Sequence, residues 1–231
     1  MNVLVIDCSG HNLRTGLLFR EDEFQELISD SSGNHSENII IQIDNLLKSN
    51  NLKLADMDAL SINIGPGSFT GLRIGMAAVS ALAQAASIPI TGFNAFEAIA
   101  HDLRSCAGDF LAVISCRGDE FYTAQYRAAS GQVELIGEYR IIDIKKFNAP
   151  SQKLNLIGSG AEKFYRKLSD DLKSEFILDD DWEQFPCLRS FAELAVENLE
   201  IKSNAGHKPP DLFYLALSQA EVKYGQNKSL N

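Results

Sequence analysis

The sequence predicts an α/β protein built from two lobes, and three observations support this fold class. Three short strand-like runs joined by tight turns open the chain, which is typical of an antiparallel meander. Helix-like and strand-like segments then follow one another as far as residue 104. A composition shift at 105–109 introduces a second set of strand-like runs. We therefore expect one lobe over 1–105 and a second over 106–231.

The elements of the first lobe follow from periodicity and end signals. Asn34 and Glu37 have the spacing of a capping box, and Ile39, Ile43 and Leu46 then recur at helical spacing, so a helix is expected over about 35–49. The other expected elements are strands at 3–6, 15–19, 24–29, 60–64 and 88–93, and helices at 70–87 and 95–104.

The second lobe reads as further strands followed by helices. Strands are expected at 110–116, 121–127, 132–142 and 154–158, and helices at 161–172, 191–201 and 215–224. We expect the last of these helices to pack back on the first lobe.

Bulk composition excludes several classes of protein. Of the 231 residues, 45% are hydrophobic and 23% are charged, as in an ordinary globular protein. The net charge of −10 argues against binding nucleic-acid backbone without a basic partner. The four cysteines form no CxxC pair, and neither a signal peptide nor a membrane-spanning run is visible. We expect a cytoplasmic protein that does not contact the membrane.

A glycine-rich loop, NIGPGSFTGLRIG over 63–75, lies between a strand-like run and a helix-like segment. Backbone N–H groups at a helix start can bind an anion, so a nucleotide could contact Asp7, Gly65, Gly67, Ser68, Thr70 and Gly71. The loop lacks the lysine of a P-loop and has one residue too many for the G-x-G-x-x-G fingerprint. Anion site and tight packing corner both remain open.

The helix behind this loop is rich in small residues. Gly71, Gly75 and Ala78 recur at intervals of four and three, and the helix carries almost no charge after Arg73. Such a helix packs closely on most sides. It is either the central core helix of the fold or a surface that a partner grips.

Catalytic groups are scarce in this chain. The four histidines lie far apart and form no HxxxH or HExxH pair, so we expect no metal site and no catalytic residue. Asp7 is the most suggestive carboxylate. It ends the first strand, where a side chain either faces a ligand cleft or caps its own turn.

The order of the motifs is more specific than any one of them. VLVIDCS, then HSENII, then GPGSFTGLRIG and IPITGFNAFEAIA resemble the bacterial TsaB (YeaZ) family over 1–105, and more loosely beyond. The resemblance implies an actin/Hsp70-like (ASKHA, ribonuclease H-like) fold of two related lobes. It also implies a role in making N6-threonylcarbamoyladenosine at position 37 of tRNAs that read codons beginning with A.

The resemblance further implies a non-catalytic subunit. The related catalytic subunit, TsaD, carries a metal-binding N-H-x-x-x-H segment, and the two histidine positions hold Ala95 and Ile99 here. Neither side chain can ligate a metal. The implied role is a scaffold that activates a TsaD-like subunit, through interface residues on the two helices at about 35–49 and 70–86: His35, Ile39, Ile43, Leu46, Leu72, Gly75, Met76 and Val79.

The remaining expectations concern partners and an alternative function. A TsaE-like ATPase joins the complex, tRNA is met only through the complex, and the chain alone can form a homodimer. No cofactor is required by this chain. The alternative is an independent ATP-binding enzyme that uses Asp7 and the loop over 65–71 around Mg-nucleotide. The hairpin SCRGDEFY and the string Tyr214-Leu215-Ala216 depart from the family pattern, which leaves any role tied to those positions in question.

Overall fold

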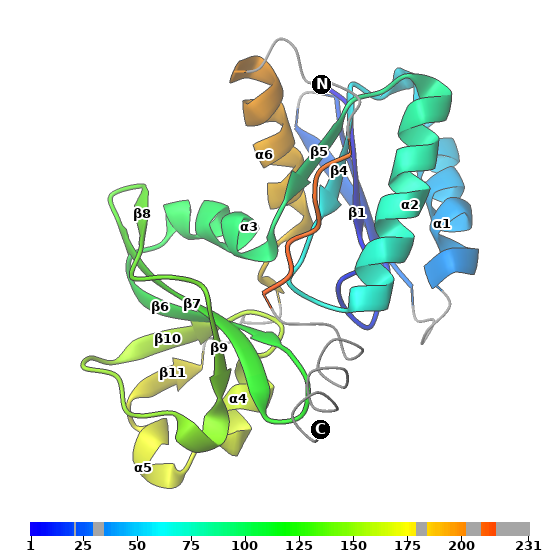
Figure 1. The fold of residues 1–231 in the computed structure, drawn as a ribbon. Coiled ribbons are helices and arrows are strands. Elements are labelled where there is room, and N and C mark those ends of the chain that lie inside the picture. The colour runs from blue at the N-terminus through cyan, green and yellow to red at the C-terminus, as the bar shows by residue number, and fades with distance from the viewer. Residues whose placement is uncertain (21, 30–34, 179–183, 202–208, 216–231) are drawn as a thin grey trace, which may run out of the picture.

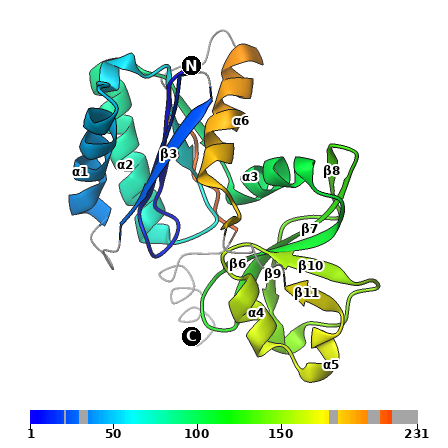
Figure 2. The same cartoon turned by 180° about the vertical axis from the view of Figure 1, so that it is seen from behind.

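The computed structural model describes residues 1–20, 22–29, 35–178, 184–201 and 209–215. In Figure 1 the chain forms two lobes, each with its own β-sheet and covering helices. Figure 2 shows the same arrangement from behind.

The first sheet has five strands in the order β3-β2-β1-β4-β5. β1, β2 and β3 form an antiparallel meander, while β4 runs parallel to β1 and β5 parallel to β4. The strands are β1 (Val3–Asp7), β2 (Arg14–Phe19), β3 (Glu23–Ile28), β4 (Ala59–Asn63) and β5 (Ile90–Phe93).

The second sheet repeats this topology in the order β11-β10-β6-β7-β8. β6, β7 and β8 are again antiparallel neighbours, and β10 and β11 are again added in parallel beside the first strand. The strands are β6 (Gly108–Ser115), β7 (Glu120–Ala129), β8 (Gln132–Leu135), β9 (Arg140–Asp143), β10 (Leu154–Ile157) and β11 (Phe176–Leu178). β9 also pairs with β7.

Helices cover both faces of each sheet. The helices are α1 (His35–Ser49), α2 (Phe69–Ala86), α3 (Ala95–Asp102), α4 (Ala161–Lys167), α5 (Asp170–Lys173) and α6 (Leu188–Ile201). Short 3₁₀ turns lie at η1 (Leu54–Asp56), η2 (Leu103–Ser105) and η3 (Ile144–Lys146). In Figures 1 and 2, α1 and α2 lie on one side of the first sheet and α6 on the other.

β1 shows why its sheet needs cover on both faces. All five of its residues are buried. Leu4 and Ile6 join the core under α1 and α2, whereas Val3 and Val5 join the core under α6. Because successive side chains of a strand point to opposite faces, the continuous apolar run demands two covering layers.

β6 repeats this alternation in the second lobe. Phe110, Ala112 and Ile114 pack in the cluster that contains α3, whereas Leu111 and Val113 pack in the cluster that contains α4. The two first strands of the two sheets are therefore equivalent in burial as well as in topology.

α6 returns from the second lobe to the first. It follows β11 in the chain, yet it packs on β1, β2 and β4. Its start is capped from α3, because the Cys187 N–H donates to Asp102 Oδ2 (2.9 Å) and the Ser190 hydroxyl donates to Asp102 Oδ1. Part of the range 106–231, which we expect to form the second lobe, thus completes the core of the first.

Most predicted elements are confirmed, and the differences have local causes. The run expected over 132–142 is two strands, because Gly137 turns the chain with φ of 87°. The helix expected over 161–172 ends at Lys167, since Leu168 adopts an extended conformation. β11 was not predicted, because three residues are too few to show alternation. Asn34 and 216–224 of the last expected helix lie outside the described residues.

None of the helices within the described ranges is long and apolar enough to cross a membrane.

Candidate functional site

The glycine-rich loop forms a corner between β4 and α2. The Gly65 N–H donates to Asn63 Oδ1 (2.9 Å), and the Gly65 carbonyl accepts from the Ala95 N–H (2.8 Å). The Gly65–Pro66 peptide bond is cis. Ser68 is the N-cap of α2, and its hydroxyl accepts from the Gly71 N–H (3.2 Å). Each of these contacts fixes the path of the loop with groups from the chain itself.

Asp7 is held inside the same corner. Its Oδ1 accepts from the Ser9 N–H (2.8 Å) and from Asn63 Nδ2 (3.1 Å). Its Oδ2 lies 4.0 Å from the Arg14 guanidinium, which also donates to Glu26 (2.7 Å). Asp7 is 5% exposed. The carboxylate therefore caps its own turn and lies beside a half-buried arginine.

Gly67 and Gly71 bring the loop directly onto the turn after β1. A Cβ added at Gly67 would lie 2.5 Å from the Ser9 carbonyl oxygen, and one at Gly71 would overlap the Cys8 carbonyl oxygen. The Ser68 N–H also donates to the Ser9 carbonyl (2.7 Å). These glycines are required for close backbone packing, which accounts for them without a ligand.

This arrangement fits Mg-nucleotide poorly. Both hydrogen bonds to Asp7 go to Oδ1, and the guanidinium of Arg14 near Oδ2 repels a cation. The backbone of Cys8 and Ser9 fills the space in front of Gly67 and Gly71. Among the expected nucleotide contacts, Ser68 and Thr70 are exposed.

The segment over 209–215 lies across the corner. The Phe213 N–H donates to the Ile64 carbonyl (2.9 Å). Tyr214 packs on Phe69, with ring centroids 5.1 Å apart, and the Arg73 guanidinium lies 3.9 Å from the Phe69 ring centroid. This segment therefore joins the end of the described chain to the start of α2.

The interface residues expected on α1 and α2 face mostly inward. His35 is the first residue of α1, and Met76 is half-buried. The others are buried in the core of the first lobe: Ile39, Ile43, Leu46, Leu72, Gly75 and Val79. An apolar stripe at helical spacing marks the buried face of a helix, whichever surface a partner uses. The outward faces of α1 and α2 carry other residues.

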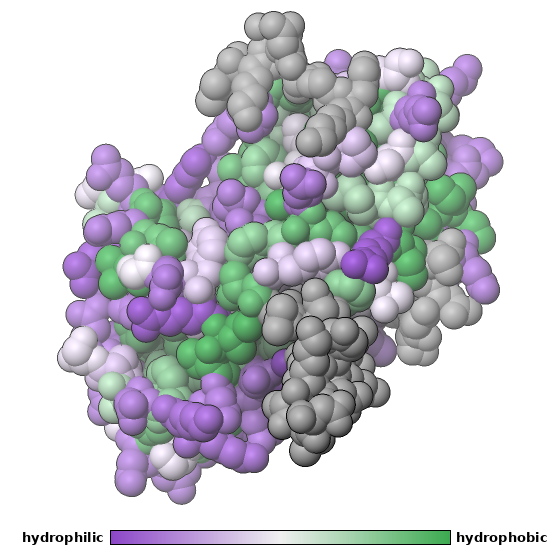
Figure 3. All heavy atoms as spheres, viewed as in Figure 1, coloured by the Kyte–Doolittle hydropathy of each residue, from purple (hydrophilic) through white to green (hydrophobic). Residues whose placement is uncertain are grey.

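The outward face of α2 carries small residues, whereas that of α1 carries two isoleucines together with the exposed ion pair of Asp44 and Lys48. On α1, Ile40 is 48% exposed and Ile41 is 59% exposed. On α2, Ala77, Ala81 and Ala85 are exposed and recur at intervals of four. Figure 3 shows apolar and near-neutral colours over much of α2 and the adjoining part of α1. Small side chains let another helix approach closely.

α3 holds the positions that correspond to histidines in the related catalytic subunit. Ala95 and Ile99 are both buried against the second sheet. His101, two residues further on, points instead towards α6, with its ring nitrogens 3.6 Å from Glu193 and 3.5 Å from Glu197. No group of three metal-ligating side chains occurs in the part of the chain described here.

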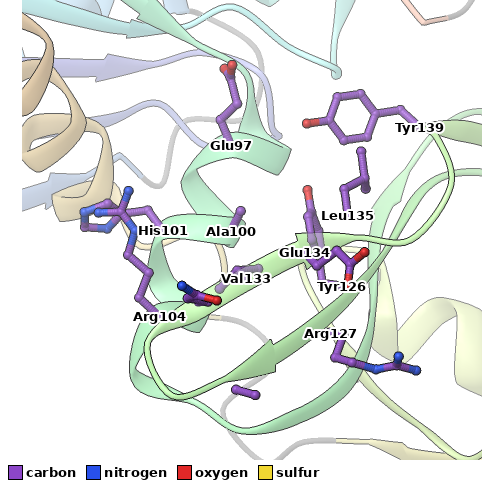
Figure 4. Close-up of a pocket in the computed structure, with 12 residues that line it drawn as sticks. Glu97, Ala100, His101, Arg104, Tyr126, Arg127, Val133, Glu134, Leu135 and Tyr139 are labelled. Atoms are coloured by element: carbon purple, nitrogen blue, oxygen red, sulfur yellow. The ribbon is translucent and has the colours of Figure 1, made fainter.

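A hollow lies between α3 and the β7–β8 hairpin, with a volume of about 820 Å³. Figure 4 shows Ala100 and His101 on the α3 side, Val133 and Leu135 on the β8 side, and Tyr139 at one end. Its walls are apolar and aromatic with a charged rim. No residue in it was predicted as a site.

The cysteines and the second-lobe hairpin carry no sign of nucleophilic chemistry. Burial raises the pKa of the Cys8 thiol to about 12, with a smaller effect from Asp7, so it stays protonated at neutral pH. In the hairpin, Asp119 pairs with Lys145 and Lys167, which lowers its pKa to about 2. The two ion pairs connect the β6–β7 hairpin turn to η3 and to α4.

Sequence reasoning overlooked Asn63 and Arg14. Asn63 ends β4 next to β1, which Asp7 ends, and parallel neighbours bring such residues together. The sequence signal for this contact is that β1 and β4 each end in a polar residue. Arg14 had no such signal, because only the register of β2 places it opposite Asp7.

The repeated topology of the two sheets defines the class of protein. Two lobes, each with a meander extended by parallel strands in the same order, make this an α/β protein of the actin/Hsp70-like, ribonuclease H-like class. The solved structure of YeaZ from Pseudomonas aeruginosa has the same fold, with a TM-score of 0.73 and 21% identity over 93% of this chain and 99% of that one.

The sequence comparisons then give the family. The TsaD family model, described as tRNA N6-adenosine threonylcarbamoyltransferase, matches residues 29–223. The TsaB protein of Bacillus subtilis is 29% identical over 136 residues, and that of Haemophilus influenzae is 33% identical over 130. The chain belongs to the TsaD family and, within it, is related to the TsaB (YeaZ) proteins.

These matches cover part of each relative. The matched segment spans 59% of the Bacillus protein and 59% of this chain. It spans 53% of the Haemophilus protein and 54% of this chain. Both relatives are named tRNA threonylcarbamoyladenosine biosynthesis proteins.

Proposed function

We propose that this chain is a non-catalytic subunit in the synthesis of N6-threonylcarbamoyladenosine on tRNA, and that it binds and activates a TsaD-like catalytic subunit. The observation that carries the proposal is the outward face of α1 and α2. α2 exposes a line of alanines, Ala77, Ala81 and Ala85, and α1 exposes Ile40, so each of these two packed helices presents uncharged side chains outward. Contiguous exposed apolar surface is typical of protein–protein contact sites.

The composition of α3 supports a non-catalytic role. Alanine and isoleucine at positions 95 and 99 offer no metal ligand, and both side chains are buried. The catalytic chemistry then belongs to the partner. In this proposal a TsaE-like ATPase joins the same assembly. The partner, rather than this acidic chain, binds the tRNA.

The same surface accounts for a homodimer in the absence of the partner. An unpartnered apolar helix face tends to self-associate, and a two-fold axis would pair α2 with its copy. The homodimer and the heterodimer would compete for one surface.

A charge placed on α2 tests the proposal. Ala81→Arg should weaken association with the cognate TsaD-like protein by at least about 30-fold, roughly 2 kcal/mol, because an unpaired charge would be buried. Ala149→Arg, at an exposed alanine of the second lobe, is the matched control. Light scattering of the mixed proteins measures association, and the thermal midpoint of each variant alone checks folding. Equal association by both variants would refute the α2 surface.

Reconstitution of tRNA modification separates the proposal from its alternative. The scaffold hypothesis expects modification only when this chain and the TsaD-like protein are both present. The alternative, an ATP-binding enzyme using Asp7 and the loop over 65–71, expects the isolated chain to bind and turn over ATP with Mg²⁺. The Arg14 guanidinium beside Asp7 disfavours Mg²⁺ there and so favours the scaffold. Tight ATP binding with turnover in calorimetry would overturn it.

A further inference from the structure

One arginine near the start of α2 differs from all the others in this chain. Every other arginine lies within 4.0 Å of an aspartate or a glutamate. Within the described ranges, Arg73 has an aromatic ring and a hydroxyl beside it instead of a carboxylate. The chain has 31 acidic residues and 21 basic ones, so carboxylates are in excess. An arginine that pairs with none of those described is available to a carboxylate from another protein.

The guanidinium of Arg73 is nevertheless held in one place. It lies over the Phe69 ring, and its Nε donates to the Tyr214 hydroxyl (3.2 Å). Phe69 and Tyr214 also pack on each other, so the three side chains form one cluster. The hydrogen bond to Tyr214 uses Nε, and the N–H groups of Nη1 and Nη2 can donate to another acceptor. A guanidinium that is already oriented loses little further freedom when a carboxylate binds it.

Arg73 shares one line of α2 with the exposed alanines. Phe69, Arg73, Ala77, Ala81 and Ala85 recur at intervals of four, which places them along one ridge of the helix. Arg73 and the three alanines are all exposed. A partner that packs along the alanines would therefore also cover Arg73. Because a charge that loses its water without gaining a counter-ion is costly, such a partner must bring a carboxylate to this end of α2.

A second copy of this chain does not bring that carboxylate on α2. Arg73 is the only charged residue among the 18 residues of α2. If the α2 lines of two copies packed on each other, each copy would bring an arginine and no acidic residue to the contact. A different protein with an aspartate or a glutamate opposite Arg73 would make a favourable pair. The charge of Arg73 therefore distinguishes a heterologous partner from a second copy.

We propose that Arg73 is the specificity-determining residue of the α2 surface, and that it pairs with an aspartate or a glutamate on a helix of the TsaD-like partner. This inference rests on the function proposed above, because it names what the partner brings to α2. Phe69 and Tyr214 are positioning residues, since they hold the guanidinium in place. The alanines let the partner helix approach closely, and the ion pair fixes its register along α2.

Substitutions at Arg73 test the proposal with the full chain and the cognate TsaD-like protein. Arg73→Gln removes the charge and should raise the Kd at least about tenfold in calorimetry. Arg73→Lys keeps the charge but loses the planar fork, and should raise the Kd about threefold. Arg140→Gln is the matched control and should bind as wild type does, because Arg140 is an exposed arginine on β9 of the second lobe. Thermal midpoints check that each variant is folded.

Double-mutant cycles identify the carboxylate on the partner. Each aspartate and glutamate on the surface of the TsaD-like protein is changed in turn to its amide. One of these changes should weaken binding to the wild-type chain about as much as Arg73→Gln does. The same change should have little further effect on binding to the Arg73→Gln chain. A merely structural role of Arg73 would give no such coupling.

Two further measurements ask whether the carboxylate comes from this chain itself. Glu221 is the only acidic residue that follows Tyr214 in the sequence, and Glu221→Gln should leave binding of the TsaD-like protein unchanged. Self-association of this chain in sedimentation should be unchanged by Arg73→Gln. The inference is overturned if Glu221→Gln weakens binding as much as Arg73→Gln does. It is also overturned if Arg73→Gln dissociates a homodimer, because the carboxylate would then belong to a second copy.

The outcomes separate this inference from the proposed function. If the wild-type chain does not bind the TsaD-like protein, or if Ala81→Arg binds as wild type does, the proposed function fails and this inference fails with it. If Ala81→Arg weakens binding but Arg73→Gln does not, only this inference is overturned. The same holds if no carboxylate of the partner couples to Arg73.

Discussion

The two lobes have the same strand order, but different interactions hold the turns next to their first strands in place. In the first lobe the chain after β4 packs on the end of β1, and in the second lobe the chain after β10 packs on the end of β6. A glycine lies at each contact. Gly71 meets Cys8 in the first lobe, and Gly160 meets Ser115 in the second. In the first lobe the corner also contains the buried pair Asp7 and Asn63. In the second lobe the hairpin is held at the surface by Asp119 and two lysines.

This difference predicts how each lobe responds to perturbation. Hydrogen bonds to a buried carboxylate are shielded from salt but costly to break, because a desolvated group is left without a partner. Surface ion pairs contribute little and are screened by salt. Mutations in the corner of the first lobe should therefore lower stability strongly and by the same amount at every salt concentration. Mutations in the hairpin of the second lobe should lower stability slightly, and only at low salt.

The largest expected effect is at the glycine contact of the first lobe. Gly71→Ala should lower the free energy of unfolding by about 3 kcal/mol or more, because its Cβ would overlap the Cys8 carbonyl and the backbone must move. Gly160→Ala should cost less, since its Cβ would lie 2.7 Å from the Ser115 nitrogen. Urea unfolding measures both.

Gly10→Ala is the control for these variants. A Cβ added at Gly10 meets nothing within 4 Å, so the substitution should change stability little. If Gly71→Ala were as stable as Gly10→Ala, the close packing of the loop on Cys8 would be wrong.

The next effect concerns the buried polar pair. Asn63→Leu removes the Nδ2 donor to Asp7 and the acceptor for the Gly65 N–H. Unpaired buried groups should then lower the unfolding free energy by about 2–3 kcal/mol, by the same amount at low and high salt. Urea midpoints at two salt concentrations measure this. A loss that disappears in high salt would contradict a buried, shielded pair.

The contact between Asp102 of α3 and the start of α6 should show a pH effect of opposite sign to that of a salt-bridged carboxylate. Burial raises the pKa of Asp102 from 3.8 to about 6, against the hydrogen bonds from Ser190 and Cys187. The folded state therefore binds the proton more tightly than the unfolded state. Keeping the carboxylate charged costs about 3 kcal/mol above pH 6, and the cost is relieved as pH falls from 6 to 3.8.

Asp102→Asn should therefore stabilise the protein at pH 7, by about 1–3 kcal/mol, since the amide oxygen still accepts at the start of α6. The advantage over wild type should shrink towards pH 4. Unfolding free energies across that range measure it. A variant that is less stable than wild type at pH 7 would show that the charged cap outweighs its desolvation.

The smallest effect is expected at the second-lobe hairpin. Asp119→Asn removes two exposed ion pairs, with Lys145 and Lys167. The loss of stability should be slight at low salt and absent in about 1 M salt, where the Debye length is about 3 Å. Thermal midpoints at both salt concentrations measure it. A large loss of stability that does not depend on salt would contradict the predicted difference between the two lobes.

Local sequence signals predicted the elements well but not their boundaries or partners. The apolar run of β1 identified a buried strand, which is confirmed. The small-residue pattern of α2 identified a helix, but the expectation that it is packed on most sides is wrong, because one face is buried and the opposite face is exposed. The return of α6 to the first sheet had no local signal, because its apolar stripe fits either lobe equally. β9 and β11 are short strands that only their neighbours define.

The candidate site was predictable in part. The sequence indicated Asp7 and the loop over 63–75, which do meet in the structure. It could not indicate that Arg14 lies beside Asp7, since that depends on the register of β2. It also pointed to the inward stripes of α1 and α2, because periodicity marks the buried face of a helix and outward alanines leave no such mark.

The sequence by itself determined the α/β class, the order of the elements and, through GPGSFTGLRIG, the resemblance to the TsaB family. These properties are local, since they depend on periodicity, turn residues and short motifs. Only the tertiary structure decided that the glycine loop packs on Cys8 and Ser9, that Asp7 accepts a hydrogen bond from Asn63, and which side chains of α1 and α2 are exposed. These depend on contacts between residues distant in the chain, and one sequence does not record which distant residues meet.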